Sequence, residues 1–232
     1  MKPYSLFIAD LHLQAATSAK NKLFFDFLQS KQAKKADALY ILGDLFEAWV
    51  GDDDNSEFAQ QVKSALKQFT DTGVATYFLP GNRDFLVGPR FAQETGCTIL
   101  TDPSKIDLYG VPTLLTHGDI LCANDVLHTR FRKVSHNRFC QRCFLLLPLK
   151  LRRLMAQYLR NLSIKNSQNK TAYSEQLVAE AAQKLTQKYQ AKQIIHGHLH
   201  LAAKYDNRIS LGSWDNVGAN NHSPVYIIAK NS

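Results

Sequence analysis

The chain has 232 residues, of which 45% are hydrophobic, and its 28 basic and 20 acidic residues give a formal net charge of +8 at pH 7. This length suits one substantial core, no run of about 18 apolar residues predicts a transmembrane helix, and four cysteines are too few for a disulfide scaffold. The start of the chain lacks the apolar core and cleavage site of a signal peptide, so we expect one cytoplasmic domain over residues 1–232.

From the N-terminus, short apolar runs alternate with stretches of helical periodicity. The runs fit strands buried on both faces of a sheet, and apolar residues spaced three and four apart fit helices packed on that sheet. In chain order we predict a strand over 4–8, a helix over 20–32, a strand over 38–42, a helix over 57–71 and a strand over 76–79. A helix over 89–96, strands over 97–100, 106–111 and 113–116, a helix over 174–189, and strands over 193–196, 204–205, 208–211 and 225–229 follow. This order predicts an α/β fold with mixed sheets.

Each of five predicted strands is followed by side chains that can bind a metal ion. Open α/β sheets keep their chemistry at the carboxyl ends of their strands, and glycine beside four of these positions lets the backbone approach a ligand. The candidate metal ligands are Asp10, His12, Asp44, Asn82, His117, His198 and His200.

The chemistry of this set indicates two metal sites. Oxygen and imidazole ligands without a thiolate suit Mn²⁺, Fe²⁺ or Zn²⁺ rather than Ca²⁺. Seven ligands are too many for one tetrahedral site, but they suffice for two adjacent sites that share a bridging carboxylate. Two metals about 3.5–4 Å apart can activate water and hold both oxygens of a phosphoryl transfer. A hydrogen bond in the core would explain any one of these histidines, but it does not explain the whole set.

Other polar residues near these positions are interpreted differently. His196 lies on the strand itself and is expected to be a hydrogen-bonded core histidine. Asp84 and Asp119 are expected to orient an imidazole or an arginine. Residues 52–54 are three successive acids, which we interpret as a solvated turn or helix cap. Trp49 is either a wall of the substrate site or a cover over the core.

Residues 122–173 interrupt the alternation of strands and helices. They are rich in Phe, Leu and Arg and contain Pro148, so we predict an inserted cap of two or three amphipathic helices at about 122–173. Residues 126–174 hold 11 basic residues and no acidic residue, which leaves 17 basic and 20 acidic residues elsewhere. Cys140 and Cys143 are expected to be reduced helical thiols; a zinc or redox pair is the alternative.

In chain order, Asp10-x-His12, Gly43-Asp44, Gly81-Asn82, His117 and Gly197-His198-x-His200 resemble the signature of the calcineurin-like metallophosphoesterases. The resemblance implies a two-sheet mixed β-sandwich flanked by helices, with two divalent metals at the strand ends. It implies one metal on Asp10, His12, Asp44 and His200. It implies the second on Asp44, Asn82, His117 and His198, with Asp44 as the bridge. The catalytic residues would be Asp44, Asn82, Arg83 and His117.

Arg83 departs from the usual pattern of that family. Its members usually carry Gly-Asn-His-Asp or Gly-Asn-His-Glu, in which the histidine can assist an alkoxide leaving group, whereas this chain has Gly81-Asn82-Arg83-Asp84. Arginine is not a proton donor at neutral pH, but it binds phosphate in a bidentate manner. A phosphate leaving group needs no proton, so Arg83 favours cleavage of a pyrophosphate bond.

Arg83, the segment Leu42–Asp53 and the basic insertion together resemble the UDP-2,3-diacylglucosamine pyrophosphohydrolase family of lipid A biosynthesis. That resemblance covers nearly the whole chain. It implies hydrolysis of UDP-2,3-diacylglucosamine to UMP and 2,3-diacylglucosamine 1-phosphate, with Mn²⁺ as the usual metal. The substrate contacts that it implies are Asn82, Arg83, Asp125, Ser163, Ser167, Lys170 and His198.

The basic insertion is expected to serve a lipid substrate. Its apolar face would cover the active site as a slot for acyl chains, and its cationic face, including Arg152 and Arg153, would meet an anionic membrane surface. The protein would then lie peripherally on the cytoplasmic face of the inner membrane, with no nucleic acid and no obligate protein partner. The alternatives are a solvated flap, a nuclease or nucleotide phosphodiesterase with a nucleic-acid groove, and a non-catalytic membrane-surface binding protein.

Overall fold

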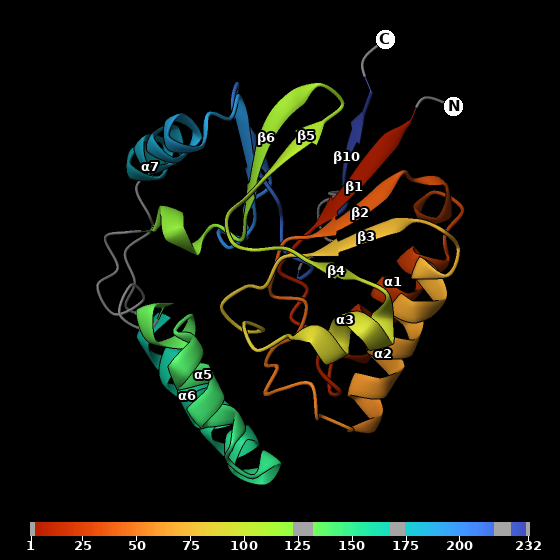
Figure 1. Cartoon of the computed structure of the whole chain (residues 1–232), viewed down its shortest axis with the longest axis vertical. Coiled ribbons are helices and arrows are strands. Elements are labelled where there is room, and N and C mark those ends of the chain that lie inside the picture. The colour runs from red at the N-terminus through yellow and green to blue at the C-terminus, as the bar shows by residue number, and fades with distance from the viewer. Residues whose placement is uncertain (1–2, 123–131, 168–174, 216–223, 231–232) are drawn as a thin grey trace.

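The computed structural model describes residues 3–122, 132–167, 175–215 and 224–230, which form two five-stranded sheets that face each other (Figure 1). The first sheet has the order β10 (Tyr226–Ala229), β1 (Tyr4–Ile8), β2 (Ala38–Ile41), β3 (Ala75–Phe78), β4 (Thr98–Ile99). The second has the order β5 (Ser104–Leu108), β6 (Val111–Thr116), β7 (Gln193–His196), β9 (Arg208–Ser210), β8 (Ala203–Lys204). Both sheets are mixed, since β10 runs antiparallel to β1 and β5 runs antiparallel to β6. The predicted two-sheet α/β sandwich is confirmed.

The uninterrupted apolar runs reflect burial of the first sheet on both faces. Successive residues of a strand point to opposite faces. Leu6 and Ile8 therefore lie in the core beneath the helices, whereas Phe7 lies in the core between the two sheets. There the ring of Phe7 stacks on Tyr40 at 4.9 Å between centroids, and Tyr40 stacks on Tyr77 at 4.8 Å.

Helices cover the outer face of each sheet. Apolar residues of α1 (Ser18–Gln29), α2 (Glu57–Thr70) and α3 (Pro89–Thr95) share one core with the first sheet. Val178 and Ala182 of α7 (Glu175–Tyr189) pack with Leu114 and Ile194 of the second sheet. Two single 3₁₀ turns, η1 (Ala33–Lys35) and η2 (Asp119–Leu121), follow α1 and β6.

The ends of two predicted helices have local causes. The helix expected over 20–32 ends at Gln29, because Ser30 is extended (φ −64°, ψ 147°) and its Oγ accepts a hydrogen bond from the N–H of Ala33 at 3.1 Å. That contact starts η1 instead. The helix expected over 57–71 is capped by Ser56, whose Oγ accepts from the N–H of Ala59 at 3.3 Å.

The described part of the basic segment includes the helices α5 (Arg138–Leu145) and α6 (Leu149–Ser167), which Pro148 separates (Figure 1). Asn137 begins α5, and its side-chain oxygen accepts from the N–H groups of Phe139 and Cys140 at 2.9 and 3.1 Å. Cys140 and Cys143 of α5 are free thiols. That residues 122–173 form an inserted cap stays a prediction, because residues 123–131 and 168–173 lie outside the described part.

Much of the apolar surface of α5 and α6 faces solvent. Phe144 packs against the main core, but the exposed fractions of Phe139 and Leu146 are 75% and 85%. Leu154 and Tyr158 are each 64% exposed. The exposure of these four side chains does not place the apolar face over the active site, so that expectation stays a prediction. In the part of the chain described above, no helix is long and apolar enough to cross a membrane.

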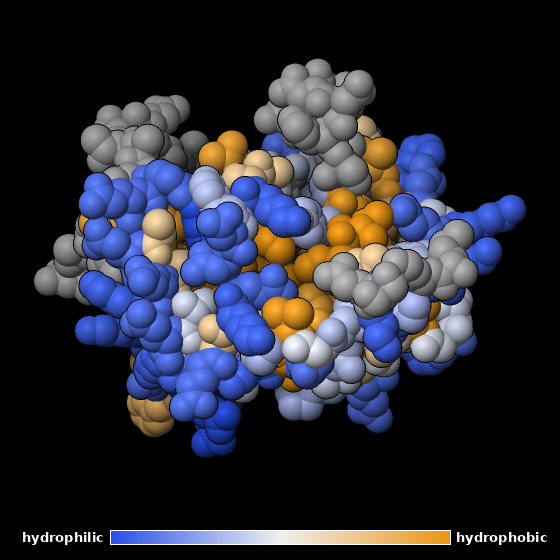
Figure 2. Space-filling view, turned by 90° about the horizontal axis from the view of Figure 1, so that it is seen from above, coloured by the Kyte–Doolittle hydropathy of each residue, from blue (hydrophilic) through white to orange (hydrophobic). Residues whose placement is uncertain are grey.

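The end of the molecule seen from above in Figure 2 differs from this surface. Hydrophilic side chains cover much of that end, and apolar side chains show near its middle and in smaller patches toward its rim. Helices α5 and α6, which expose large apolar side chains, lie instead at the lower left of Figure 1.

Candidate metal centre

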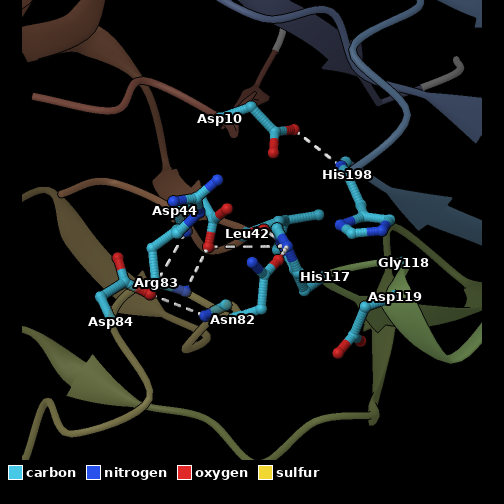
Figure 3. A network of polar contacts seen from close by, with 12 residues as sticks. Asp10, Leu42, Asp44, Asn82, Arg83, Asp84, His117, Gly118, Asp119 and His198 are labelled. Carbon is cyan, nitrogen blue, oxygen red and sulfur yellow. Dashed lines mark hydrogen bonds and ion pairs between the residues drawn. The ribbon is translucent and has the colours of Figure 1, made fainter. Parts of the chain in front are cut away.

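The candidate ligands follow the carboxyl ends of β1, β2, β3, β6 and β7, which come together between the two sheets (Figure 3). Five of them have a left-handed backbone that side chains rarely adopt: Asp10 (φ 55°), His12 (50°), Asp44 (53°), His198 (69°) and His200 (59°). Non-glycine residues in this region are held there at a cost of about 1–3 kcal/mol each, and such residues cluster at functional sites. The strand ends thus turn sharply to aim these side chains inward.

Two glycines permit the close approach of these loops. A Cβ on Gly81 would overlap the side chain of Asp44, and a Cβ on Gly197 would overlap the side chain of Asp10. The backbone of each glycine therefore lies directly against a candidate carboxylate ligand.

The structure brings the side chains together in two groups. One consists of Asp10, His12 and His200, and the other of Asp10, Asp44 and His117, with one ligand atom per residue lying within 4.8 Å of the rest in each group. Asp44 faces both groups, since its Oδ2 is 4.0 Å from His12 Nε2 and its Oδ1 is 3.6 Å from His117 Nε2. This placement suits a bridging carboxylate.

The remaining two candidates lie beside the second group. Asn82 Oδ1 is 2.8 Å from His117 Nε2. The imidazole of His198 lies 5.1 Å from that of His117 between ring centroids, and the His198 N–H donates to Asp10 Oδ2 at 2.8 Å. All seven candidates therefore surround one small volume.

A buried carboxylate oxygen without a hydrogen bond indicates that a cation fits this volume. Asp10 is fully buried, and its Oδ1 accepts no hydrogen bond from the described residues. This oxygen lies 3.5 Å from His200 Nε2. A buried ionised oxygen is costly unless a hydrogen bond, a cation or a metal compensates it.

The electrostatics of the cluster also favour a cation. Burial, with Asp84 and Asp10 nearby, raises the pKa of Asp44 to about 7 although His117 opposes the shift. Burial lowers the pKa of His12 to about 3, so this imidazole is neutral and can act as a ligand. Asp10 is ionised despite its burial, because His200, His117 and His12 lower its pKa to about 2. A divalent ion would relieve the crowding of these carboxylates.

A family model described as calcineurin-like phosphoesterase matches residues 5–202. The chain belongs to the calcineurin-like phosphoesterase family. Proteins named UDP-2,3-diacylglucosamine hydrolase are similar to this phosphoesterase over 223 residues, or 93% of its length. The one from Photobacterium profundum is 46% identical, with 91% of its own length covered. Those from Yersinia pseudotuberculosis and Klebsiella pneumoniae are 42% identical, with 92% covered. A solved archaeal phosphodiesterase aligns over 93% of this chain and 87% of its own at 12% identity, with a TM-score of 0.43.

Two acids that follow the candidate ligands stabilise the loops of the phosphoesterase in different ways. Asp84 was expected to orient an imidazole or an arginine, but it accepts from the N–H groups of Gly81, Leu45 and Asp44 at 2.7, 2.8 and 3.2 Å. It therefore joins the loops after β2 and β3. Asp84 is fully buried, and it accepts these hydrogen bonds from backbone N–H groups rather than from a side chain.

Asp119 does bind an arginine. It pairs with Arg132, whose Nη2 also donates to Asp102 Oδ2 at 3.0 Å. Asp102 Oδ1 in turn accepts from the N–H of His117 at 3.3 Å. This chain of contacts fixes the loop that carries His117, and sequence reasoning gave Asp102 and Arg132 no role. His196 is a hydrogen-bonded core histidine, as predicted, with its Nδ1 2.9 Å from Gly197 O.

The predicted substrate contacts are described only in part. Arg83 is partly exposed, and its backbone N–H donates to Asp44 Oδ1 at 2.9 Å (Figure 3). Asp125 and Lys170 lie outside the described residues. Ser163 and Ser167 lie on α6, but their side chains are outside the description. The roles of these four residues stay predictions.

The three successive acids are not a simple solvated turn. Asp52 caps α3, because it accepts from the N–H groups of Gly88 and Phe91 at 3.0 Å each. Asp53 and Asp54 form ion pairs with Arg152 and Arg153 of α6. The solvated-turn interpretation holds for Asp53, which lies in a turn with its side chain 51% exposed, but not for Asp54, whose side chain is 13% exposed. The cations that offset their repulsion come from the basic segment.

Two large side chains near this loop are buried. Trp49 is only 3% exposed and packs on Phe46 and Phe91, so it covers the core. Arg152 is 2% exposed, and it donates to the carbonyl oxygens of Val50 at 2.6 Å and Leu147 at 2.9 Å. The expectation that Arg152 faces a membrane was therefore wrong, because its guanidinium anchors α6 to the main domain.

This anchor predicts unequal effects of the two adjacent arginines. We expect Arg152→Ala to raise amide hydrogen exchange along residues 149–160 and to destabilise the attachment of α6 by about 1–3 kcal/mol, because the buried carbonyl of Val50 loses its donor. Arg153→Ala is the matched control, because an exposed ion pair contributes about 0–1 kcal/mol. Equal exchange in the two variants would show that Arg152 does not anchor the helix.

Proposed function

We propose that this phosphoesterase hydrolyses the pyrophosphate bond of UDP-2,3-diacylglucosamine, giving UMP and 2,3-diacylglucosamine 1-phosphate for lipid A biosynthesis. The observation that carries the proposal is Arg83 beside the two ligand groups, where other family members have histidine. The substrate is supported by 42–46% identity to proteins named UDP-2,3-diacylglucosamine hydrolase over 93% of the chain. A cytoplasmic protein on the inner membrane would meet this lipid.

We assign two Mn²⁺ ions to the cluster. Asp10, His12, Asp44 and His200 would hold one ion, and Asp44, Asn82, His117 and His198 the other. Oxygen and imidazole donors without thiolate suit this metal. When bound, two such ions lower the pKa of water and stabilise the attacking and leaving oxygens of a phosphoryl transfer.

Arg83 supplies what the cluster lacks, a cation that can contact phosphate. Its guanidinium binds two phosphate oxygens at once, which holds the pyrophosphate in one orientation beside the ligands. No proton donor is needed, because either product of the cleavage leaves as a phosphate monoester. His117, whose pKa is raised to about 9 by Asp44, Asp10 and Asp119 against the effect of its burial, adds positive charge when no metal is bound.

The lipid part of the substrate has a candidate pocket. A cavity of about 240 Å³ lies between the loops after β1 and β2 and helix α6. Phe46, Trp49 and Val50 line it from the loop, and Ala156 and Arg160 from the helix. Apolar walls with a cation at one side suit an acyl chain attached to a phosphorylated sugar.

The exposed surface of α5 and α6 supports peripheral binding to an anionic membrane. Phe139 and Leu146 are the most exposed of its large apolar side chains, and Arg138, Arg142 and Lys150 near them are exposed as well. Each cation at such a surface contributes about 1 kcal/mol to the free energy of membrane binding. Burial of the exposed apolar side chains in the membrane interface would strengthen the binding further.

Removing the two apolar side chains tests this contact. We expect Phe139→Ser with Leu146→Ser to reduce co-sedimentation with vesicles of anionic phospholipid, without changing turnover of substrate in detergent micelles. Leu177→Ser, at an exposed leucine of α7, is the control and should bind vesicles as the unchanged protein does. If the double variant binds vesicles as well as the unchanged protein does, the exposed face of α5 and α6 is not the membrane contact.

The function itself is tested by comparing two substrates. The chain is incubated with UDP-2,3-diacylglucosamine and with bis(p-nitrophenyl) phosphate, each with and without Mn²⁺. We expect turnover of the lipid nucleotide only, and only with the metal. Preference for the phosphodiester would instead indicate a nucleotide phosphodiesterase or nuclease of the same family.

A further inference from the structure

Glu47 occupies a central place beside the metal centre. It follows Asp44 by three residues, and its backbone N–H donates to Leu13 O at 3.0 Å, which holds the loop after β2 against the loop after β1. Its side chain is 15% exposed, and it belongs to neither ligand group among the described residues. Glu47 is thus adjacent to the ligands without being one of them.

The two carboxylate oxygens of Glu47 contact three different functional side chains. Oε1 lies 3.3 Å from Arg83 Nη1 and 3.0 Å from Arg160 Nε. Oε2 lies 3.6 Å from His12 Nδ1. On the other side of the same imidazole, His12 Nε2 points into the ligand group, 3.2 Å from His200 Nε2.

We infer that Glu47 is a positioning residue, whose carboxylate orients His12 toward the metals and holds Arg83 in place for the substrate. This inference rests on the proposed function. A histidine that binds a metal usually has a carboxylate or carbonyl at its other ring nitrogen, which fixes the ring orientation and makes the imidazole a better ligand. Glu47 stands at that position for His12, whose Nδ1 has no hydrogen-bond partner among the described residues.

The second role of Glu47, holding Arg83 in place for the substrate, follows from charge. Arg83 lies next to Asp44, and its positive charge acts on that carboxylate. Without a competing acid, the guanidinium of Arg83 would be drawn to the ligand carboxylates instead of the substrate phosphates. Glu47 offers a carboxylate outside both ligand groups, and Arg160 shares this carboxylate with Arg83. The same contact links α6 to the metal centre.

Metal binding without substrate gives the first test. We expect Glu47→Gln to weaken Mn²⁺ binding, measured by the electron paramagnetic resonance signal of free Mn²⁺, by about 10–100-fold. Glu47→Asp retains the charge and should recover part of this loss. Glu94→Gln is the matched control, because Glu94 also pairs with two cations, Lys63 and Arg90, but lies on α3 away from the ligands. Native Mn²⁺ affinity in Glu47→Gln would overturn the assignment.

A second comparison distinguishes orientation of His12 from attachment of α6. Arg160→Gln removes the link between Glu47 and α6 and leaves the contact to His12. We expect its Mn²⁺ affinity to stay within about twofold of the native value, whereas equal losses in Arg160→Gln and Glu47→Gln would contradict positioning of His12.

With the lipid nucleotide, Glu47→Gln should lower kcat as well as raise KM. If the unchanged protein binds Mn²⁺ but cleaves no lipid nucleotide, the proposed function fails while the metal test of Glu47 still holds.

Discussion

Replacing Asp44 with alanine is expected to reduce hydrolysis of the lipid nucleotide to the level of the chelated protein, and added Mn²⁺ should not restore it. The reason is geometric: Asp44 directs one oxygen toward His12 and the other toward His117, so its loss affects both metal sites at once. The measurement is turnover against Mn²⁺ concentration for Asp44→Ala and, as a comparison, for His200→Ala, which would remove a ligand of one site only. Near-normal activity of Asp44→Ala would contradict the two-metal assignment.

A stability measurement separates this effect from misfolding. The pKa of Asp44 is raised in the folded chain, so the stability linked to its protonation is present below the ordinary pKa of 3.8 and lost as the pH rises through about 7. At pH 8, metal-free Asp44→Asn should therefore melt no lower than the unchanged protein. Mn²⁺ should raise the Tm of the unchanged protein much more than that of the variant. Asp44→Asn should be as inactive as Asp44→Ala, and a large drop in its metal-free Tm would attribute the loss of activity to unfolding.

Replacing Arg83 with histidine should cut pyrophosphate cleavage by orders of magnitude and raise a trace activity on bis(p-nitrophenyl) phosphate. Histidine can donate a proton to an alkoxide but cannot bind two phosphate oxygens in the manner of a guanidinium. Arg83→Lys is the matched variant, because it retains the charge without the bidentate geometry. Its pyrophosphate-cleaving activity should lie between that of the unchanged protein and that of Arg83→His. Lipid-nucleotide turnover by Arg83→His at the native rate would remove the argument for a pyrophosphate substrate.

The strand ends could be predicted because their signal is local. Short apolar runs, a glycine and a polar side chain follow one another within a few residues, so the α/β class and the seven candidate ligands could be predicted from the residues. The two-sheet arrangement was implied only by the resemblance to the metallophosphoesterases. Cys97–Leu100 was predicted as a strand for the same reason, and β4 lies within it.

The contacts that the sequence did not reveal join distant segments. Arg152 lies in a basic amphipathic stretch, where arginine is normally exposed, and its partner Asp53 is 99 positions away. Glu47 is one acid in an acidic loop, and only the fold brings His12, Arg83 and Arg160 to it. In each case the charge was visible in the sequence, but its partner was decided by how α6 and the strand-end loops pack.

Product analysis of a single reaction tests the central claim most directly. The chain is incubated with Mn²⁺ and UDP-2,3-diacylglucosamine in micelles, and the products are identified by mass spectrometry. Cleavage of the pyrophosphate bond predicts UMP and 2,3-diacylglucosamine 1-phosphate in equal amounts, and none of either after chelation. Release of UDP with unphosphorylated diacylglucosamine, or no turnover in the presence of bound Mn²⁺, would contradict the account.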